Sequence, residues 1–238
     1  SNFILEDFKK AGIHTQYILT SESEETGQAF ITVDEAGQNT ILVYGGANMT
    51  LSATDVEMSV DAFIGADFVV AQLEVPFEAI EQAFKIARKQ NITTVLNPAP
   101  AIELPKSLLE LTDIIIPNET EAELLTGISI NNESDMKETA TYFLDLGISA
   151  VLITLGEQGT YCAYQEQYKM IPACNVKAID TTAAGDTFIG AFLSELNKDL
   201  SNLESAIRLA NQASSLTVQR KGAQASIPTR KEVEAEYN

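Results

Sequence analysis

The residues best suited to chemistry lie in the stretch from Asp180 to Phe188. Three small residues, Ala183, Ala184 and Gly185, stand directly before Asp186 at the predicted start of a helix. The first N–H groups of a helix lack intrahelical partners and its N-terminal end is positive, so a phosphate can approach the backbone there. A carboxylate beside that phosphate can accept the proton of an attacking hydroxyl group. The stretch therefore predicts a phosphoryl-transfer site with Asp186 as general base.

A simpler explanation for Asp186 is that an acidic side chain stabilises any helix start. A short Gly-Asp-Thr pattern is too common to decide between the two explanations. His14 is the only histidine of the chain, so a histidine relay and a histidine-rich metal site are excluded.

The elements that would position this stretch alternate between apolar runs and amphipathic helices. Continuous apolar runs such as Ile114 to Ile116 suit strands that are covered on both faces, and helices between them imply parallel, right-handed crossovers. The pattern predicts a doubly wound, mostly parallel α/β sheet. The predicted strands are 68–73, 93–96, 113–116 and 150–154, and the predicted helices are 77–90, 106–111, 119–125 and 134–146. A β-rich segment over 159–179 and helices over 185–197 and 203–218 follow.

The chain ahead of this core has a different pattern. Residues 3–12 space their apolar side chains on one helical face and end at a glycine, which predicts a helix. Two β-rich runs, 27–33 and 40–44, are joined by turn residues 34–38 and predict a hairpin. A capping box at Ser52 to Asp55 predicts a helix through about Ile64. We expect residues 1–238 to form one domain, with residues 17–45 as part of a small β lid.

Composition limits the partners of the chain. With 34 acidic and 15 basic residues, the net charge is −19, which repels nucleic acid and anionic membranes. No apolar run approaches the length of about 20 residues that a membrane-spanning helix needs. The only two cysteines, Cys162 and Cys174, have apolar neighbours that suit buried free thiols, although a bridge between them stays open. We expect a cytoplasmic protein that binds small molecules.

Several motifs together resemble one enzyme family. The stretch from Asp180 to Phe188 is similar to the C-terminal signature of the ribokinase-like (PfkB) sugar kinases. Other marks of that family follow in its usual order and cover essentially the whole chain. They are Asn97 to Ala101, Pro117 to Glu121, Leu152 to Gly156 with Gly159, and Arg220 to Ala223. The resemblance implies transfer of the γ-phosphoryl group of ATP to a sugar hydroxyl, with the 5-hydroxyl of ribose as the expected acceptor.

The resemblance also implies roles for single residues. Asn118 and Glu121 match an N-x-x-E motif that supports Mg²⁺ largely through water, although the same pair would also cap a helix. Glu74 matches a residue that contacts the sugar. Further positions match residues around the nucleotide or around a monovalent cation, K⁺, that binds mostly to main-chain carbonyls. The nucleotide positions are Thr154, Gly156, Gly159, Gly185 and Asn211. The K⁺ positions are Asp180, Thr182, Thr217, Arg220, Gly222 and Ser226.

The chain departs from the family pattern in its N-terminal region. The family's Gly-Gly-Lys-Gly-Ala-Asn loop occurs nowhere in it, and its N-terminal region contains no Asn-x-Asp sugar contact. We therefore expect either that the first strands of the family fold, part of the lid and half of the sugar site lie outside this sequence, or that the chain has lost sugar binding. Three functions stay open: a ribose kinase, a kinase for another sugar or nucleoside, and a catalytically silent nucleotide-binding or assembly protein. The hairpin has an edge that could pair with a second copy, which predicts a homodimer.

Overall fold

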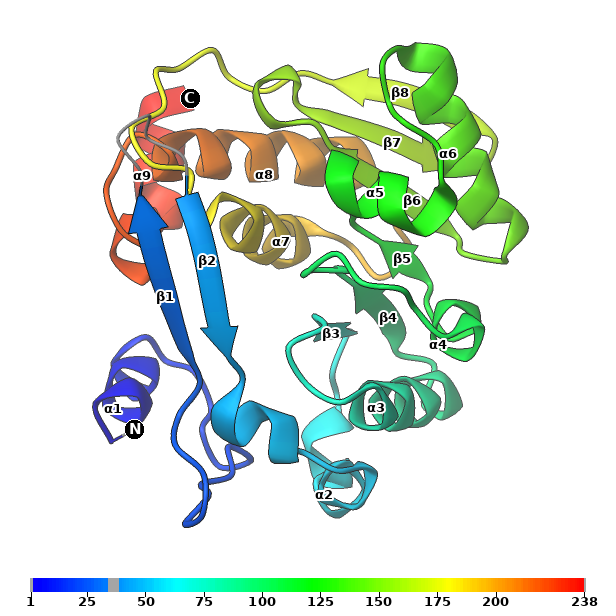
Figure 1. Cartoon of the computed structure of the whole chain (residues 1–238). Helices are drawn as coiled ribbons and strands as arrows, with labels where there is room; N and C mark the ends of the chain where they lie inside the picture. Colours follow the sequence, from blue (N-terminus) through cyan, green and yellow to red (C-terminus); the bar gives the residue numbers. More distant parts are fainter. Residues whose placement is uncertain (1, 34–38, 238) are drawn as a thin grey trace.

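The computed structural model describes residues 2–33 and 39–237. Its centre is one six-stranded sheet in the order β3-β4-β5-β6-β7-β8 (Figure 1). The first four strands are parallel, and β7 and β8 continue the sheet in antiparallel fashion. The strands are β3 (Phe68–Ala71), β4 (Thr93–Leu96), β5 (Ile114–Ile115), β6 (Ala150–Thr154), β7 (Thr160–Tyr164) and β8 (Gln167–Ile171). The predicted mostly parallel sheet is confirmed.

Helices cover both faces of this sheet, as the continuous apolar strands predict. Alternate strand residues point to opposite faces: Ile114 and Leu152 pack in the core under α7 and α8, whereas Ile115 packs in the core under α5 and α6. Figure 1 shows these two helix pairs on opposite sides of the strands. The helices of this core are α3 (Phe77–Lys89), α4 (Lys106–Glu110), α5 (Glu119–Thr126), α6 (Glu133–Asp145), α7 (Ala184–Glu195) and α8 (Leu203–Thr217).

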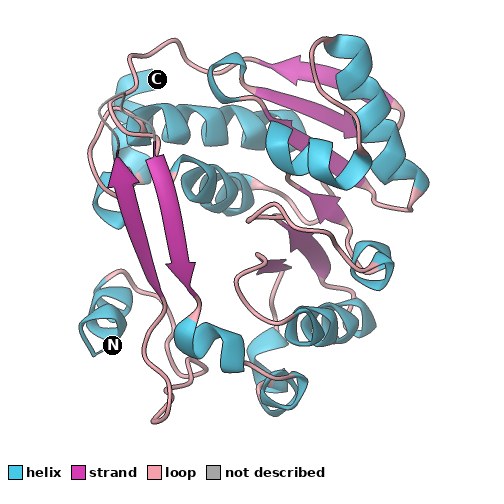
Figure 2. Ribbon diagram, in the orientation of Figure 1, coloured by secondary structure: helices cyan, strands magenta, loops and turns pink. Residues whose placement is uncertain are grey.

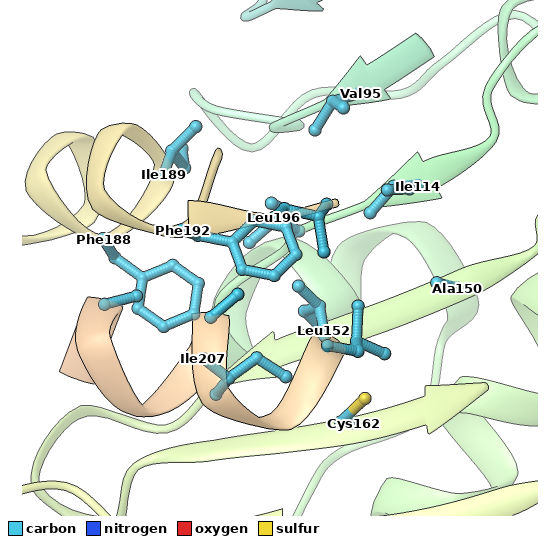
Figure 3. Packing of buried hydrophobic residues seen from close by; sticks show 14 of the residues in the cluster. Val95, Ile114, Ala150, Leu152, Cys162, Phe188, Ile189, Phe192, Leu196 and Ile207 are labelled. Atoms are coloured by element: carbon cyan, nitrogen blue, oxygen red, sulfur yellow. The ribbon is translucent and has the colours of Figure 1, made fainter. Parts of the chain in front are cut away.

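The core under α7 fixes the place of that helix. Phe188 and Phe192 stack with ring centroids 6.2 Å apart and face Leu152 of the sheet and Ile207 of α8 (Figure 3). Burying one such aromatic side chain is worth about 1.5–3 kcal/mol. Cys162 lies in the same cluster as a free thiol, and burial raises its pKa to about 12. Cys174 is also a free thiol.

The hairpin forms a separate two-stranded sheet (Figure 2). β1 (Gln28–Val33) pairs antiparallel with β2 (Asn39–Tyr44), as predicted, and the predicted turn 34–38 lies outside the described residues. Helix α1 (Asn2–Lys10) precedes the hairpin and confirms the predicted first helix. A short 3₁₀ helix, η1 (Gly46–Thr50), follows it.

Three predicted elements end earlier than expected. The helix predicted through Ile64 splits into α2 (Ala53–Met58) and a 3₁₀ turn, η2 (Val60–Phe63), because Ser59 donates its hydroxyl hydrogen to the Asp55 carbonyl at 2.9 Å and competes with the helical ladder. The strand predicted over 68–73 ends at Ala71. The β-rich segment predicted to residue 179 ends at Ile171, because the next residue is a proline without an N–H group.

One helix was not predicted. α9 (Arg230–Tyr237) follows a short 3₁₀ turn, η4 (Gln224–Ser226), and buries Val233 against α8. Thr229 and Glu232 cap its start, with the Thr229 N–H donating to the Glu232 carboxylate at 2.8 Å. Its sequence is mostly charged and has few apolar residues, which explains why sequence reasoning missed it. In the described part of the chain, no helix combines the length and the apolar character of a membrane span.

Candidate active site

The start of α7 presents backbone N–H groups to solvent. Ala183 precedes the helix in the left-handed conformation, with φ of 61°, and no side chain caps the helix there. Ala184 donates its N–H to the Thr181 carbonyl at 3.2 Å. The next N–H groups, of Gly185 and Asp186, belong to the first turn, where a helix offers no acceptor of its own. Gly185 and Asp186 are exposed, so this positive helix end is accessible to an anion.

Asp186 is tied to the carboxyl edge of the sheet. Gln72, which follows β3, donates from Nε2 to the Asp186 Oδ1 at 3.2 Å and to the Asn97 Oδ1 at 3.3 Å. Asn97, which follows β4, donates from Nδ2 to the carbonyl of Ile116 after β5 at 2.8 Å. Three neighbouring strands thus contribute to one hydrogen-bonded chain that ends on the predicted base. Ligands of open α/β sheets bind at this carboxyl edge.

Sequence reasoning missed Gln72, although it assigned a role to Glu74, two residues further along the chain. Glu74 itself is exposed on the same segment after β3. Asn97 belongs to a motif that carried the family resemblance, but no role was predicted for it. The position of both residues in the sequence was the signal that could have identified them. Polar residues directly after buried parallel strands lie at the same edge of the sheet.

Asn118 and Glu121 form a reciprocal cap at the start of α5. The Asn118 side chain accepts the Glu121 N–H at 2.8 Å, while the two Glu121 oxygens accept the Asn118 backbone and side-chain N–H groups at 2.8 and 2.9 Å. Glu121 is only 6% exposed, and burial raises its pKa. The capping role is therefore present. Because both carboxylate oxygens are occupied, the pair suits a cation that is held through water molecules.

Thr154 lies beside this cap. The Thr154 N–H donates to the Pro117 carbonyl at 2.9 Å, and Asn118 and Thr154 form a parallel bridge. The structure thus brings the predicted cation-supporting and nucleotide-binding residues together at the ends of β5 and β6. Gly156 follows in an exposed 3₁₀ turn, η3 (Gly156–Gln158).

Gly159 has a structural reason to be glycine. Its φ is +110°, and a Cβ atom there would lie 2.2 Å from the carbonyl oxygen of Ile171. The turn that follows β6 therefore packs directly against the end of β8. Gly159 is buried, so its contribution to a nucleotide site would come through the shape of this turn.

Asn211 on α8 is buried, and its amide group is engaged within the protein. Its Nδ2 donates to the carbonyls of Ile171 and Pro172 at 3.1 and 3.2 Å, and its Oδ1 accepts the Thr160 hydroxyl at 2.9 Å. These contacts join the end of β8 to α8. The predicted role of Asn211 at the nucleotide site would therefore act through packing rather than through its amide group.

The predicted K⁺ residues surround the loop before α7. Asp180 accepts the Thr182 N–H at 3.0 Å and the Gly222 N–H at 2.9 Å, and so joins two loops. The Thr217 hydroxyl lies 3.1 Å from that of Thr187 on α7, and the Ser226 hydroxyl donates to the Ala223 carbonyl at 2.6 Å. Arg220 forms an ion pair with Glu232. Because these side chains are hydrogen-bonded or ion-paired within the protein, the oxygen ligands left for a cation are main-chain carbonyls, which suit a weakly hydrated ion.

A side-chain metal cluster or a hollow elsewhere on the sheet would be the alternatives to this edge. No group of three or more metal-ligating side chains occurs within residues 2–33 and 39–237. A hollow of about 670 Å³ lies at the opposite edge of the sheet, between the start of β4 and the loop before α8, where it is lined by Arg88, Thr93 and Lys198. It contains none of the predicted site residues, so the chemistry places the candidate site at the start of α7.

Comparisons with known proteins find relatives over nearly the whole chain. The family described as pfkB family carbohydrate kinase matches residues 1–230. A ribokinase of Staphylococcus aureus is 64% identical over 233 residues, which are 98% of this chain and 77% of the relative. A bifunctional ribokinase/ribose-5-phosphate isomerase A of Fructilactobacillus sanfranciscensis is 50% identical over 98% of this chain and 43% of its own length. The structure of an Arabidopsis thaliana ribokinase complexed with ribose and ATP superimposes with a TM-score of 0.84 at 33% identity, covering 94% of this chain and 73% of that one.

The hydrogen bonds from Thr182 and Gly222 to Asp180, which together form a clamp between two loops, predict how the free energy of unfolding depends on pH. The Gly222 N–H, and after it the hydroxyl and N–H of Thr182, lower the pKa of Asp180 to about 2. Since the folded pKa lies below the ordinary value of 3.8, the stabilisation is complete above that value and is lost as the pH falls through about 2. Asp180→Asn should therefore lower the free energy of unfolding at neutral pH, and the difference from the unsubstituted protein should shrink at acidic pH. Urea unfolding at a series of pH values measures it.

Asp61→Asn, at an exposed position in η2, is the control for removing one negative charge from an acidic protein. A difference between Asp180→Asn and the unsubstituted protein that stays constant down to pH of about 2.5 would contradict the clamp.

Proposed function

Because the chain belongs to the pfkB family of carbohydrate kinases, we propose that it transfers the γ-phosphoryl group of ATP to the 5-hydroxyl group of D-ribose. The ribokinase of Staphylococcus aureus supports ribose as the acceptor, and the Arabidopsis thaliana ribokinase complexed with ribose and ATP supports the substrate pair. The observation that carries the proposal is the exposed carboxylate of Asp186 at the positive end of α7.

Asp186 acts as the general base. As the ribose 5-oxygen attacks the γ-phosphorus, a new O–P bond forms and the bond from that phosphorus to the bridging β–γ oxygen breaks. ADP leaves with the electron pair, and Asp186 takes the hydroxyl proton. The backbone of Ala183, Ala184 and Gly185 forms an anion hole, in which the N–H groups of the first helical turn stabilise charge on the transferring phosphoryl group.

The other predicted residues bind the substrates around this centre. Glu74, exposed after β3, contacts the sugar hydroxyls. Thr154, Gly156 and Gly159 shape the turn against which the nucleotide lies, and Asn211 holds the neighbouring end of β8 in place. Asn118 supports this assembly from the start of α5.

Two cations fit the donor groups present. Mg²⁺, held through water by Asn118 and Glu121, would neutralise phosphate charge. K⁺ would bind to main-chain carbonyls of the two loops that the hydrogen bond between Asp180 and Gly222 joins. Because the loop that contains Asp180 leads into α7, its geometry sets the orientation of the anion-binding N–H groups.

We also infer that the chain is a single domain with the hairpin as part of its lid, and that the hairpin pairs with a second copy. Leu42 and Val43 of β2 are 70% and 57% exposed, and Phe30 of β1 is also exposed. An apolar two-stranded sheet with unpaired edges is a surface that a second strand can complete.

Ribose-dependent release of ADP by the purified chain, with Mg²⁺ and K⁺ present, tests the main proposal. We expect release with ribose and little with other sugars or with nucleosides. Asp186→Asn should lower kcat by about a thousandfold, because it removes the base, while the affinity for ATP measured by calorimetry stays nearly unchanged. Asp145→Asn, exposed at the end of α6, is the matched control.

Release with a different sugar or a nucleoside would overturn ribose as the acceptor. Binding of ATP without release for any acceptor would favour a silent nucleotide-binding protein. Equal turnover by Asp186→Asn would remove Asp186 from the role of base.

The K⁺ proposal predicts a dependence on the monovalent cation. Replacement of K⁺ by tetramethylammonium at constant ionic strength should lower kcat by about tenfold, which corresponds to about 1.4 kcal/mol of transition-state stabilisation. Initial rates at saturating ATP and ribose measure it. An unchanged rate would exclude a cation at this loop.

The lid proposal predicts a concentration-dependent homodimer. Leu42→Glu should shift sedimentation velocity from dimer toward monomer, because it places a charge on the apolar face of the hairpin. Met58→Glu, which replaces an equally exposed apolar side chain on α2, should leave the dimer intact. A monomer at every concentration before substitution would contradict pairing.

A further inference from the structure

The chain of hydrogen bonds that ends on Asp186 has a fixed direction. It begins at the Ile116 carbonyl, which can only accept, so the Asn97 side chain must turn its NH₂ group toward it. The Asn97 oxygen therefore faces Gln72, and Gln72 must present its own NH₂ group there. That same nitrogen also lies 3.2 Å from the Asp186 Oδ1. The carbonyl group that follows β5 thus determines that the side chain next to Asp186 presents a hydrogen-bond donor to it.

The backbone around Gln72 and Asn97 is held equally firmly. The Asn97 N–H donates to the Ala71 carbonyl at 3.0 Å, and the Leu73 N–H donates to the Ala99 carbonyl at 2.8 Å. These two bonds flank Gln72 on both sides. Gln72 and Asn97 are half-buried, whereas Asp186 is exposed. The chain therefore runs from a rigid interior anchor to a carboxylate at the solvent edge.

We propose that Gln72 is a positioning residue for the base. It holds Oδ1 of Asp186, which leaves Oδ2 to receive the hydroxyl proton, and it prevents the carboxylate from rotating away from the acceptor. This inference rests on the proposed role of Asp186 as base.

A tie that only joined α7 to the sheet would predict something different. Loss of such a tie would lower stability and affect all kinetic constants together. Loss of a positioning donor lowers kcat more than it changes KM, because the interaction that is lost acts on the base in the transition state.

Gln72→Met removes the donor and keeps an unbranched side chain of similar size. We expect kcat to fall by about tenfold, the loss typical of a hydrogen bond to a charged group, while KM for ATP and ribose changes by less than about threefold. Gln72→Glu, which keeps the length of the side chain but replaces the amide donor by a second carboxylate beside Asp186, should lower kcat at least as much.

Gln82→Met is the matched control. Gln82 also donates from Nε2 to a carboxylate, that of Glu57 at 2.9 Å, but it lies on α3 away from the site. It should keep kcat and KM unchanged. If either Gln72 variant leaves kcat unchanged, or changes kcat and KM by the same factor, the positioning role is overturned.

A second measurement keeps this inference separate from the proposed function. Carbon-13 NMR spectra of labelled aspartate carboxyl groups at one neutral pH, with the Asp186 signal assigned by its loss in Asp186→Asn, report the hydrogen bonding of Asp186 without turnover. A changed Asp186 chemical shift in Gln72→Met and an unchanged one in Gln82→Met support the inference, even if ribose is not the acceptor. An unchanged Asp186 chemical shift in both variants overturns it. Failure of ribose-dependent release before any substitution, by contrast, overturns only the proposed function.

Discussion

The site depends on the packing of α7 across the sheet. Phe188 and Phe192 bury this helix against Leu152 of β6 and Ile207 of α8, and that contact directs its N-terminus toward the carboxyl edge of the strands. Every feature of the proposed chemistry follows from this orientation, because the exposed N–H groups, the base and the ends of β3 to β6 meet only if α7 lies in this direction. The packing of the apolar face of α7 thus determines where its polar residues lie.

The sequence predicted most of the fold because buried parallel strands and amphipathic helices have clear periodicities. β4 and β6 have the predicted bounds, whereas α9 has too few apolar residues to be recognised. Asp186 could be found from a local pattern. Gln72 could not, because its significance depends on partners 25 and 114 residues away in the chain. Sequence spacing reveals contacts within one element and does not reveal contacts between them.

Most polar side chains near the site are already engaged within the protein. Asn211, Glu121 and Asp180 direct their donors and acceptors to neighbouring protein groups. The groups left for ligands are largely backbone N–H groups and carbonyls, together with a few exposed carboxylates. Such a site is rigid before the ligand arrives, so binding requires little reorganisation of the protein. Specificity then resides in the shape of the backbone more than in the identity of single side chains.

Gly159 illustrates what this means for evolution of the chain. Every other amino acid carries a Cβ atom, and at this position that atom would overlap the backbone of β8. No compensating rotamer exists for a clash between a Cβ atom and a carbonyl oxygen. Any substitution of Gly159 therefore requires the neighbouring strand to move as well. Gly159 is predicted to contact the nucleotide, but its packing against the end of β8 requires glycine independently of that contact. The requirement would therefore persist in a descendant protein that no longer binds the substrate.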